Sequence, residues 1–252
     1  MQNCYYPLPA QPQLPLPVDD DVPMERLDNL RLSSNDIRRP FMQLGAVSRA
    51  AGSAYVEFGR TRVVCAVYGP RTDTRARREF SREGQLICDV KYAPFADEWS
   101  RRERGQDADE MELSAILEEA LAPAVMLHKM PKCVVSVFAT VLENDGGVFA
   151  AVVNAASLAL ADAAVEMYDM VTAACAGFVN GSVILDPNRK EEERGDGMLT
   201  MAYMPSVGRL TYVLQSGKID HTELQEAVDL CTDACTGVVR SLLVASLVQA
   251  LS

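Results

Sequence analysis

Arginines gather in one stretch of the chain, and arginine chemistry suits phosphate. The planar guanidinium binds two phosphate oxygens at once, which makes such a stretch a candidate RNA contact. The candidate RNA-binding side chains are Arg71, Arg75, Arg77, Arg78, Arg101, Arg102 and Arg104, with Arg82 in the same stretch. Asp and Glu are interspersed among them, so a solvated surface of mixed charge is the alternative reading.

A glycine turn, Asp145-Gly146-Gly147, precedes a long apolar segment. If that segment is a helix, its first backbone N–H groups face the turn and can bind an anion. A plain turn with a helix cap fits the same residues. A second tight turn, Gly59-Arg60-Thr61, stands before a buried strand and is expected to be structural.

Carboxylates cluster at Asp186 and at Glu191, Glu192 and Glu193. Clustered carboxylates can bind a divalent metal or act as acid and base, and they can also be ordinary loop charge. The chain has only two histidines, which argues against His-dependent triads and His-metal catalysis. Its seven cysteines lie mostly in apolar runs and complete no zinc ligand set, so buried reduced thiols are expected, with no metal and no cofactor.

The overall charge is acidic, with a net charge of −11. A protein that binds RNA on its own is usually basic, so this balance favours a role within an assembly whose partners supply basic surface. No apolar run has the length of about 18 residues that a membrane span needs, and no secretory signal is evident, so no membrane partner is expected. Residues 1–37 are rich in proline and are expected to form a flexible tail.

The elements that must position these groups alternate between strand and helix patterns. Short apolar or alternating runs predict strands, and apolar residues at a spacing of three and four predict amphipathic helices. Strands are expected at 43–48, 54–58, 62–68, 86–92, 133–142, 171–179, 182–185, 199–204 and 210–214. Helices are expected from 107 or 109 to about 123, from 148 to about 165 and from 221 to about 248, and the acidic segment 190–196 is expected to be a loop. The order predicts a mixed α/β (α+β) fold in one domain, residues 38–252.

Four segments carry a resemblance to a known family. They are GSAYVEFGRTRVVCAVYGPR (52–71), ELSAILEEALAPAV (112–125), LENDGGVFAAVVNAASLALADA (142–163) and AGFVNGSVILDPNRKEEE (176–193). In this order and spacing they resemble the RNase PH family over residues 38–250. Within the family, VEMYDMV (165–171) and LDPNRKEEER (185–194) are similar to exosome ring components of the mRNA transport regulator three type.

The resemblance implies an RNase PH-like fold, a mixed β-sheet packed with helices, and a place in the six-membered ring of the RNA exosome. Expected partners are other RNase PH-like ring subunits, cap subunits with RNA-binding domains, and RNA threading through the assembled channel. Expected processes are rRNA processing and the turnover of mRNA and non-coding RNA, in the nucleus, nucleolus and cytoplasm.

The same resemblance implies a degenerate catalytic site. Active members have a phosphate-binding arginine two residues after the Gly-Gly pair, where this chain has Phe149. They carry an aspartate six positions after the one matching Asp186, where this chain has Glu192. A non-catalytic subunit is therefore expected. The alternatives are an active phosphate-dependent 3′-to-5′ exoribonuclease and a stand-alone RNA- or protein-binding adaptor of the same fold.

Overall fold

Two β-sheets form the frame of the protein in a computed structural model, which describes residue 31 and residues 33–72, 83–97, 108–179 and 181–251. The first sheet has the order β1-β2-β3-β5-β4, with antiparallel neighbours except for the parallel pair β4 and β5. Its strands are β1 (Pro40–Leu44), β2 (Gly52–Phe58), β3 (Thr61–Thr72), β4 (Gln85–Tyr92) and β5 (Cys133–Glu143). The second sheet is antiparallel, with the order β7-β6-β8-β9. Its strands are β6 (Thr172–Val179), β7 (Ser182–Leu185), β8 (Gly197–Met204) and β9 (Arg209–Gly217).

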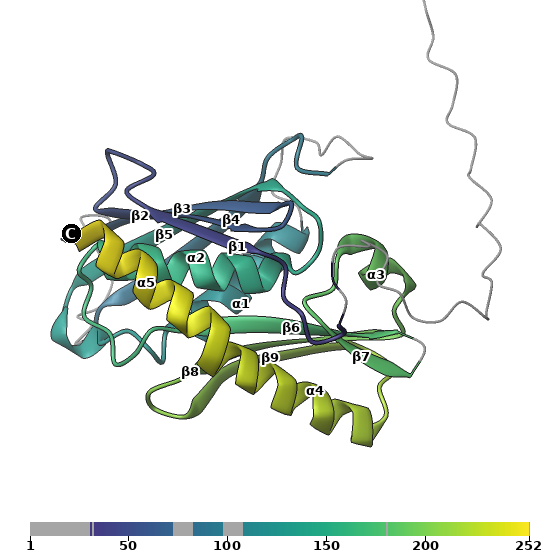
Figure 1. The fold of residues 1–252 in the computed structure, drawn as a ribbon. Helices are drawn as coiled ribbons and strands as arrows, with labels where there is room; N and C mark the ends of the chain where they lie inside the picture. Colours follow the sequence, from purple (N-terminus) through teal and green to yellow (C-terminus); the bar gives the residue numbers. More distant parts are fainter. Residues whose placement is uncertain (1–30, 32, 73–82, 98–107, 180, 252) are drawn as a thin grey trace, which may run out of the picture.

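Helix α2 (Val148–Asp162) lies between the two sheets (Figure 1). Its sequence is apolar on every side, and a helix of that kind is stable only when it is surrounded by protein. All residues from Phe149 to Leu160 are buried, and the main core cluster includes residues of both sheets. Helix α1 (Ala108–Leu121) lies beside it in the same layer, so one continuous core joins the two halves of the chain.

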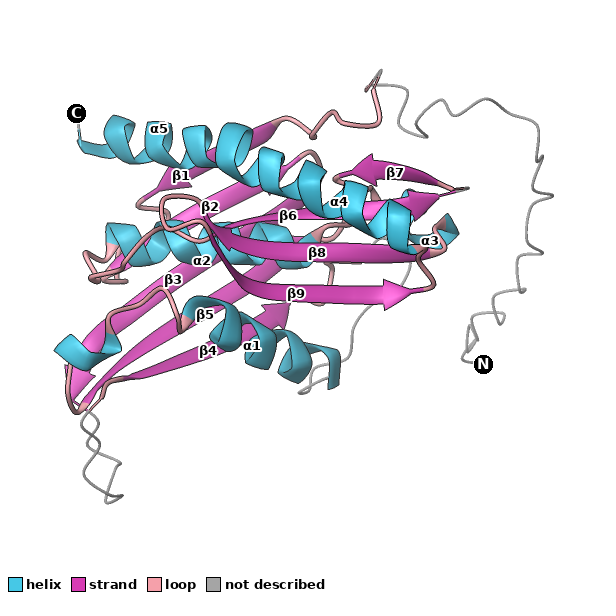
Figure 2. Ribbon diagram, turned by 90° about the horizontal axis from the view of Figure 1, so that it is seen from below, coloured by secondary structure: helices cyan, strands magenta, loops and turns pink. Residues whose placement is uncertain are grey.

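The C-terminal helical segment covers the other face of the second sheet (Figure 2). It comprises α4 (His221–Ala234), a π-helical turn (Cys235–Val239) and α5 (Arg240–Leu251), which runs along β1. By length and composition alone the helix His221–Gln249 could cross a membrane. Its residues Ala227, Cys231 and Cys235 are buried against the second sheet, as in an amphipathic helix packed on a protein core.

The structure confirms the expected mixed α/β fold, and it corrects three details. The strands form two separate sheets rather than one, because α2 fills the space between them. The first strand is Pro40–Leu44 rather than 43–48. The acidic segment after Asn188 is a helix, α3 (Arg189–Arg194), and the expectation of a loop there is wrong. A short 3₁₀ turn, Leu127–Lys129, lies between α1 and β5.

Candidate active site

The start of α2 is a glycine turn that closely approaches its neighbours. Gly146 and Gly147 have φ angles of 84° and 63°, a region that favours glycine. A Cβ at Gly146 would lie 2.7 Å from the backbone nitrogen of Arg189, and one at Gly147 would lie 2.9 Å from Nη2 of Arg38. These glycines let the helix N-terminus sit directly against charged side chains from distant parts of the chain.

Glu192 occupies that helix N-terminus. Its Oε1 accepts the backbone N–H of Gly147 at 2.7 Å, the position at which a free anion would meet the helix. Burial raises the pKa of Glu192, while the Gly147 N–H and the Arg38 charge oppose that rise. The carboxylate of this side chain therefore fills the anion position from within the chain.

Helix α3 places Glu192 there through a reciprocal cap. The side chain of Asn188 accepts the N–H of Glu191 at 2.9 Å, and Glu191 Oε2 accepts the N–H of Asn188 at 2.9 Å. Such a capping box fixes the direction in which a short helix begins. The sequence pattern made Glu191 part of a possible metal or acid cluster, whereas its carboxylate serves as a helix cap.

Asp186 is held in a buried ion pair. Its Oδ1 accepts Nη2 of Arg38 at 2.6 Å, and its Oδ2 accepts Nε and the backbone N–H of Arg38, both at 2.9 Å. Burial alone would raise the pKa of Asp186, but the charge and hydrogen bonds of Arg38, with the charge of Arg31, hold it below its usual range. A carboxyl group in this state carries no proton near neutral pH, so Asp186 cannot donate one to a leaving group.

Arg38 ties the ion pair to the glycine turn. Its Nη1 donates to the carbonyl of Asp145 at 2.7 Å, and its Nη2 donates to the carbonyl of Gly146 at 3.1 Å. The Thr61 hydroxyl donates to the Gly146 carbonyl at 2.7 Å and accepts the N–H of Asp145 at 3.1 Å. The turn at Gly59-Arg60-Thr61 was expected to be structural, and Thr61 has that role.

Arg31 adds a second cation from the segment before the first strand. Its Nη1 donates to the backbone carbonyl of Asp186 at 2.7 Å, and its Nη2 donates to Oε2 of Glu191 at 3.3 Å. Both Arg31 and Arg38 are buried, with Arg31 inside the segment that the sequence assigned to a tail ending at residue 37. That boundary stays a prediction. The sequence patterns did not point to either arginine, because nothing in their local context marks them as partners of a carboxylate far along the chain.

Phe149 contacts an aromatic ring instead of an anion. Its ring is buried and meets the ring of Tyr212 edge-on, with centroids 6.1 Å apart. A phenyl group offers no donor to a phosphate oxygen. The structure thus places Phe149, Asp186 and Glu192 at the same end of α2, and the degenerate catalytic site that the resemblance implied for them stays a prediction. Both buried arginines of the described residues at this end are engaged with carboxylates of the chain itself.

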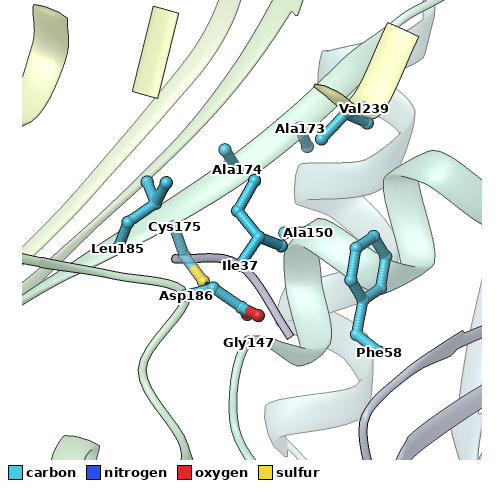
Figure 3. Close-up of a pocket in the computed structure, with 10 residues that line it drawn as sticks. All are labelled: Ile37, Phe58, Gly147, Ala150, Ala173, Ala174, Cys175, Leu185, Asp186 and Val239. Atoms are coloured by element: carbon cyan, nitrogen blue, oxygen red, sulfur yellow. The ribbon is translucent and has the colours of Figure 1, made fainter. Parts of the chain in front are cut away.

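The cavity beside Asp186 is small. Figure 3 shows Asp186 and Cys175 meeting Gly147 at its polar end, while Ile37, Phe58 and other apolar side chains form the rest of its wall. Its volume of about 20 Å³ is room for one water molecule and excludes a phosphate or nucleotide. Burial raises the pKa of the Cys175 thiol well above its usual value, so this sulfur is a neutral neighbour 3.9 Å from Oδ1 of Asp186. Within the described residues, no group of three or more His, Cys, Asp or Glu side chains could hold a metal ion.

Only one of the candidate RNA-binding arginines lies in the described part of the chain. Arg71 is exposed near the end of β3, and its Nη2 donates to the Ser136 hydroxyl at 3.2 Å. Thr61, at the other end of the same strand, contacts the glycine turn, so Arg71 lies roughly 30 Å from the site along the strand. The candidates outside the described residues are Arg75, Arg77, Arg78, Arg101, Arg102 and Arg104, together with Arg82.

Models of known protein families match both halves of the chain. The model of the 3′ exoribonuclease family, domain 1, matches residues 36–166, and that of domain 2 matches residues 169–234. The chain belongs to the RNase PH family of 3′ exoribonucleases. The resemblance seen in the sequence is therefore confirmed, and the boundary between the two family domains falls between α2 and β6, where the chain passes from the first sheet to the second.

Curated relatives in the RNase PH family are components of exosome complexes. The chain is 39% identical to the RRP41-like exosome component of Arabidopsis thaliana over 88% of this chain and 84% of the relative. It is 38% identical to the exosome component MTR3 of Mus musculus over 89% and 85%. It is 37% identical to Rrp41 of Thermococcus kodakarensis over 81% of each.

Solved structures share the fold of this RNase PH family member at low sequence identity. Rice Rrp46 matches with a TM-score of 0.76 and 22% identity, over 87% of this chain and 99% of that one. A chain of the Archaeoglobus fulgidus exosome with RNA bound to its active site matches with a TM-score of 0.73 and 22% identity, over 85% and 93%.

Proposed function

We propose that this protein is a non-catalytic structural subunit of the RNA exosome ring. In this role it supports 3′-to-5′ RNA processing and degradation by forming the RNA-threading channel with other RNase PH-like subunits. Three curated relatives with 37–39% identity, each an exosome complex component, support the assembly. The processes we propose are rRNA processing and the turnover of mRNA and non-coding RNA, in the nucleus, nucleolus and cytoplasm.

Identity alone does not choose between an active and an inactive subunit. The chain is 39% identical to the RRP41-like relative and 38% identical to the MTR3 relative, so the two sequence identities are nearly equal. The choice rests on the side chains at the start of α2.

The observation that supports an inactive site is the internal pairing of its charged groups. Phosphorolysis needs cations free to hold inorganic phosphate and a carboxylic acid able to protonate the leaving oxygen. Arg38 is committed to Asp186 and to two backbone carbonyls, Glu192 fills the helix N-terminus, and Phe149 packs on Tyr212. Loss of a single preorganised donor to a developing charge slows catalysis about 100-fold or more, and in this site several requirements fail together.

The acidic charge of the chain also favours a role inside an assembly. With a net charge of −11, an isolated chain repels RNA at long range. The proposed partners are other RNase PH-like ring subunits, cap subunits with RNA-binding domains, and RNA within the assembled channel. Arg71 and the other candidate arginines are the proposed RNA contacts of this subunit.

Two measurements test the proposal. Affinity purification of the tagged chain at near-physiological salt, followed by mass spectrometry, is expected to give a near-stoichiometric set of RNase PH-like and cap subunits. The purified chain is expected to shorten a 5′-labelled single-stranded RNA no faster with added inorganic phosphate than without it. A chain that purifies alone, and whose phosphate-dependent activity scales with its concentration, would show that it is an exoribonuclease.

The Phe149→Arg variant tests which feature of the site accounts for the inactivity expected in the second measurement. An arginine at this position restores the family's side chain, but Asp186 remains paired with Arg38 and Glu192 remains on Gly147. The variant is therefore expected to stay inactive. Phosphate-dependent shortening of the RNA by the Phe149→Arg variant would mean that Phe149, and not the internal pairing of charged groups, prevents catalysis in the unaltered chain.

A further inference from the structure

The edge of the first sheet at β4 is closed by a helix. Hydrogen-bonding groups on the outer side of an edge strand attract other strands unless something covers them. In this sheet the N–H of Val90 donates to the Ser114 hydroxyl at 2.8 Å, and the N–H of Tyr92 donates to Oε1 of Glu110 at 2.8 Å. Both acceptors belong to α1, so this helix takes the place of a further strand.

Two other edges are covered as well. At β7, the N–H of Leu185 donates to the carbonyl of Ser34 at 2.8 Å, so the N-terminal segment lies along that strand. At β1, helix α5 runs beside the strand (Figures 1 and 2).

Helix α1 contacts β9, whose Tyr212 and Leu214 pack on the core cluster that includes residues of α1. The outer backbone edge of β9 nevertheless differs from the other three edges. The strand pairs with β8 on one side, and six of its nine residues are exposed, whereas β7 has none exposed and β1 has two of five. No hydrogen bond to a side chain or to another segment is found for its backbone within the described residues. It is the long open edge among the strands that the structure describes.

The exposed apolar side chains of β9 lie on one face. Leu210 and Val213 are 50% and 46% exposed, and they pair across the strands with Tyr203 and Met201, which belong to the cluster under α4. Tyr212, by contrast, packs on the main core. Leu210 and Val213 thus belong to the face of the second sheet on which α4 packs. Helix α4 contacts β6, β7 and β8, and Figure 2 shows β9 to one side of it.

We propose that β9 is a sheet-extension site, and that an edge strand of a neighbouring RNase PH-like subunit pairs with it. This inference rests on the proposed place of the chain in an exosome ring. Main-chain hydrogen bonds would supply the pairing, and Leu210 and Val213 would be covered by side chains of the added strand.

The composition of β9 favours a strand as its occupant over RNA. Its sequence, RLTYVLQSG, carries one charge, on Arg209, whereas phosphate contacts need several cations. Its centre is rich in residues that favour strands and has none of the prolines or inward lysines that keep natural edges from pairing. A solvent-exposed edge of this kind would be an aggregation site, and a partner strand removes that hazard.

Hydrogen–deuterium exchange on the assembled complex tests the pairing directly. The chain, co-expressed with the RNase PH-like subunits that purify with it, is compared with the free chain. Amides within residues 209–217 are expected to exchange about tenfold or more slowly in the complex, because new inter-strand bonds protect them. A complex that forms while these amides stay unprotected would overturn the β9 assignment and leave the proposed function standing.

Paired variants give an independent readout. The double variant Leu210→Lys/Val213→Lys alters only exposed side chains and is expected to weaken binding to the neighbouring subunit about 10- to 100-fold. The matched control is Ile87→Lys/Phe95→Lys, which replaces two exposed apolar residues of the other half of the chain, 47% and 72% exposed, and should bind as the unaltered chain does. Equal weakening by both variants, or weakening by the control alone, would overturn the β9 site. Protection of β9 in a homodimer of the chain alone would overturn the choice of partner, and failure of the unaltered chain to bind any RNase PH-like subunit would overturn the proposed function as well.

Discussion

Removing the guanidinium of Arg38 tests whether the buried ion pair between Arg38 and Asp186 stabilises the protein. The Arg38→Met variant keeps much of the side-chain length but leaves the carboxylate of Asp186 buried with only the more distant Arg31, at 4.0 Å, as a cation. Breaking a buried pair from one side generally costs about 3–5 kcal/mol, because the remaining charge is uncompensated. Arg38 also donates to the carbonyls of Asp145 and Gly146, which adds to the loss, while Arg31 still compensates part of the charge of Asp186, so a loss within that range is expected.

The assay is thermal and chemical unfolding followed by circular dichroism. For a chain of this size, each kcal/mol corresponds to about 2–4 °C in Tm, so Arg38→Met should lower the Tm by about 6–20 °C. The matched control is Arg60→Met, because Arg60 forms a pair with Glu143 but is 67% exposed. Loss of that screened pair should cost less than about 1 kcal/mol.

A second substitution separates the ion pair from simple packing. If the cost comes from the stranded charge, adding Asp186→Asn to Arg38→Met should recover part of the lost stability. The pKa of Asp186 is held below its usual range, so the stability it contributes is present above the unfolded-state pKa, about 3.9, and is lost as the pH falls through the folded-state value. The gap between the unaltered chain and Arg38→Met should therefore be wide at neutral pH and narrow below about pH 4. A loss under about 1 kcal/mol at neutral pH, or a gap that does not depend on pH, would refute the assignment of Asp186 to a stabilising ion pair.

Two further predictions concern α2 and its N-terminus. Burial raises the pKa of Glu192, so ionisation of this side chain opposes folding above the unfolded-state pKa of about 4.3. The Glu192→Gln variant should therefore gain stability relative to the unaltered chain as the pH rises from about 4 to about 8. A stability difference that stays constant with pH in unfolding titrations would contradict this. Asn154, buried in α2, accepts the N–H and donates to the carbonyl of Ala173, both at 2.9 Å, so Asn154→Ala should destabilise the protein by about 2–4 kcal/mol. Ser157→Ala, one turn further along, is the control: its buried hydroxyl has no hydrogen-bond partner in the described structure, and urea unfolding should show its loss to be neutral or stabilising.

The local patterns of the sequence predicted most elements of the fold. The valine-rich run at 62–68 lies within β3, the run at 133–142 lies within β5, and the glycine turn before α2 falls at the expected place. Each of these signals is contained in about a dozen neighbouring residues, so a single sequence suffices to detect them. Helix α3 was missed although the spacing of Asn188 and Glu191 is a cap signal, because its six residues show no apolar period.

The contacts of the site could not be predicted in the same way. Arg38 and Asp186 are separated by 148 residues, and neither lies in a motif that indicates its partner. The resemblance to the RNase PH family led to Phe149, Asp186 and Glu192 because it compares positions, but it says nothing about which charges neutralise each other. The division into two sheets could not be predicted either, because period-two patterns show which face of a strand is buried but not which sheet the strand joins.

The geometry gives the acidic residues of the candidate site a structural role. An unpaired carboxylate at the position of Asp186 would destabilise a buried cluster. The ion pair between Asp186 and Arg38 instead joins the segment before β1 to the end of β7 and to the turn before α2. Glu192 similarly satisfies a helix N-terminus that would otherwise need an anion or water. Residues of the two family domains thus hold each other through the charged groups of the candidate site. Because these bonds join the two sheets, the proposed non-catalytic role leads us to expect that replacing Asp186 or Glu192 affects the folding of the chain, and through it the proposed assembly of a ring, rather than the rate of a reaction at this site.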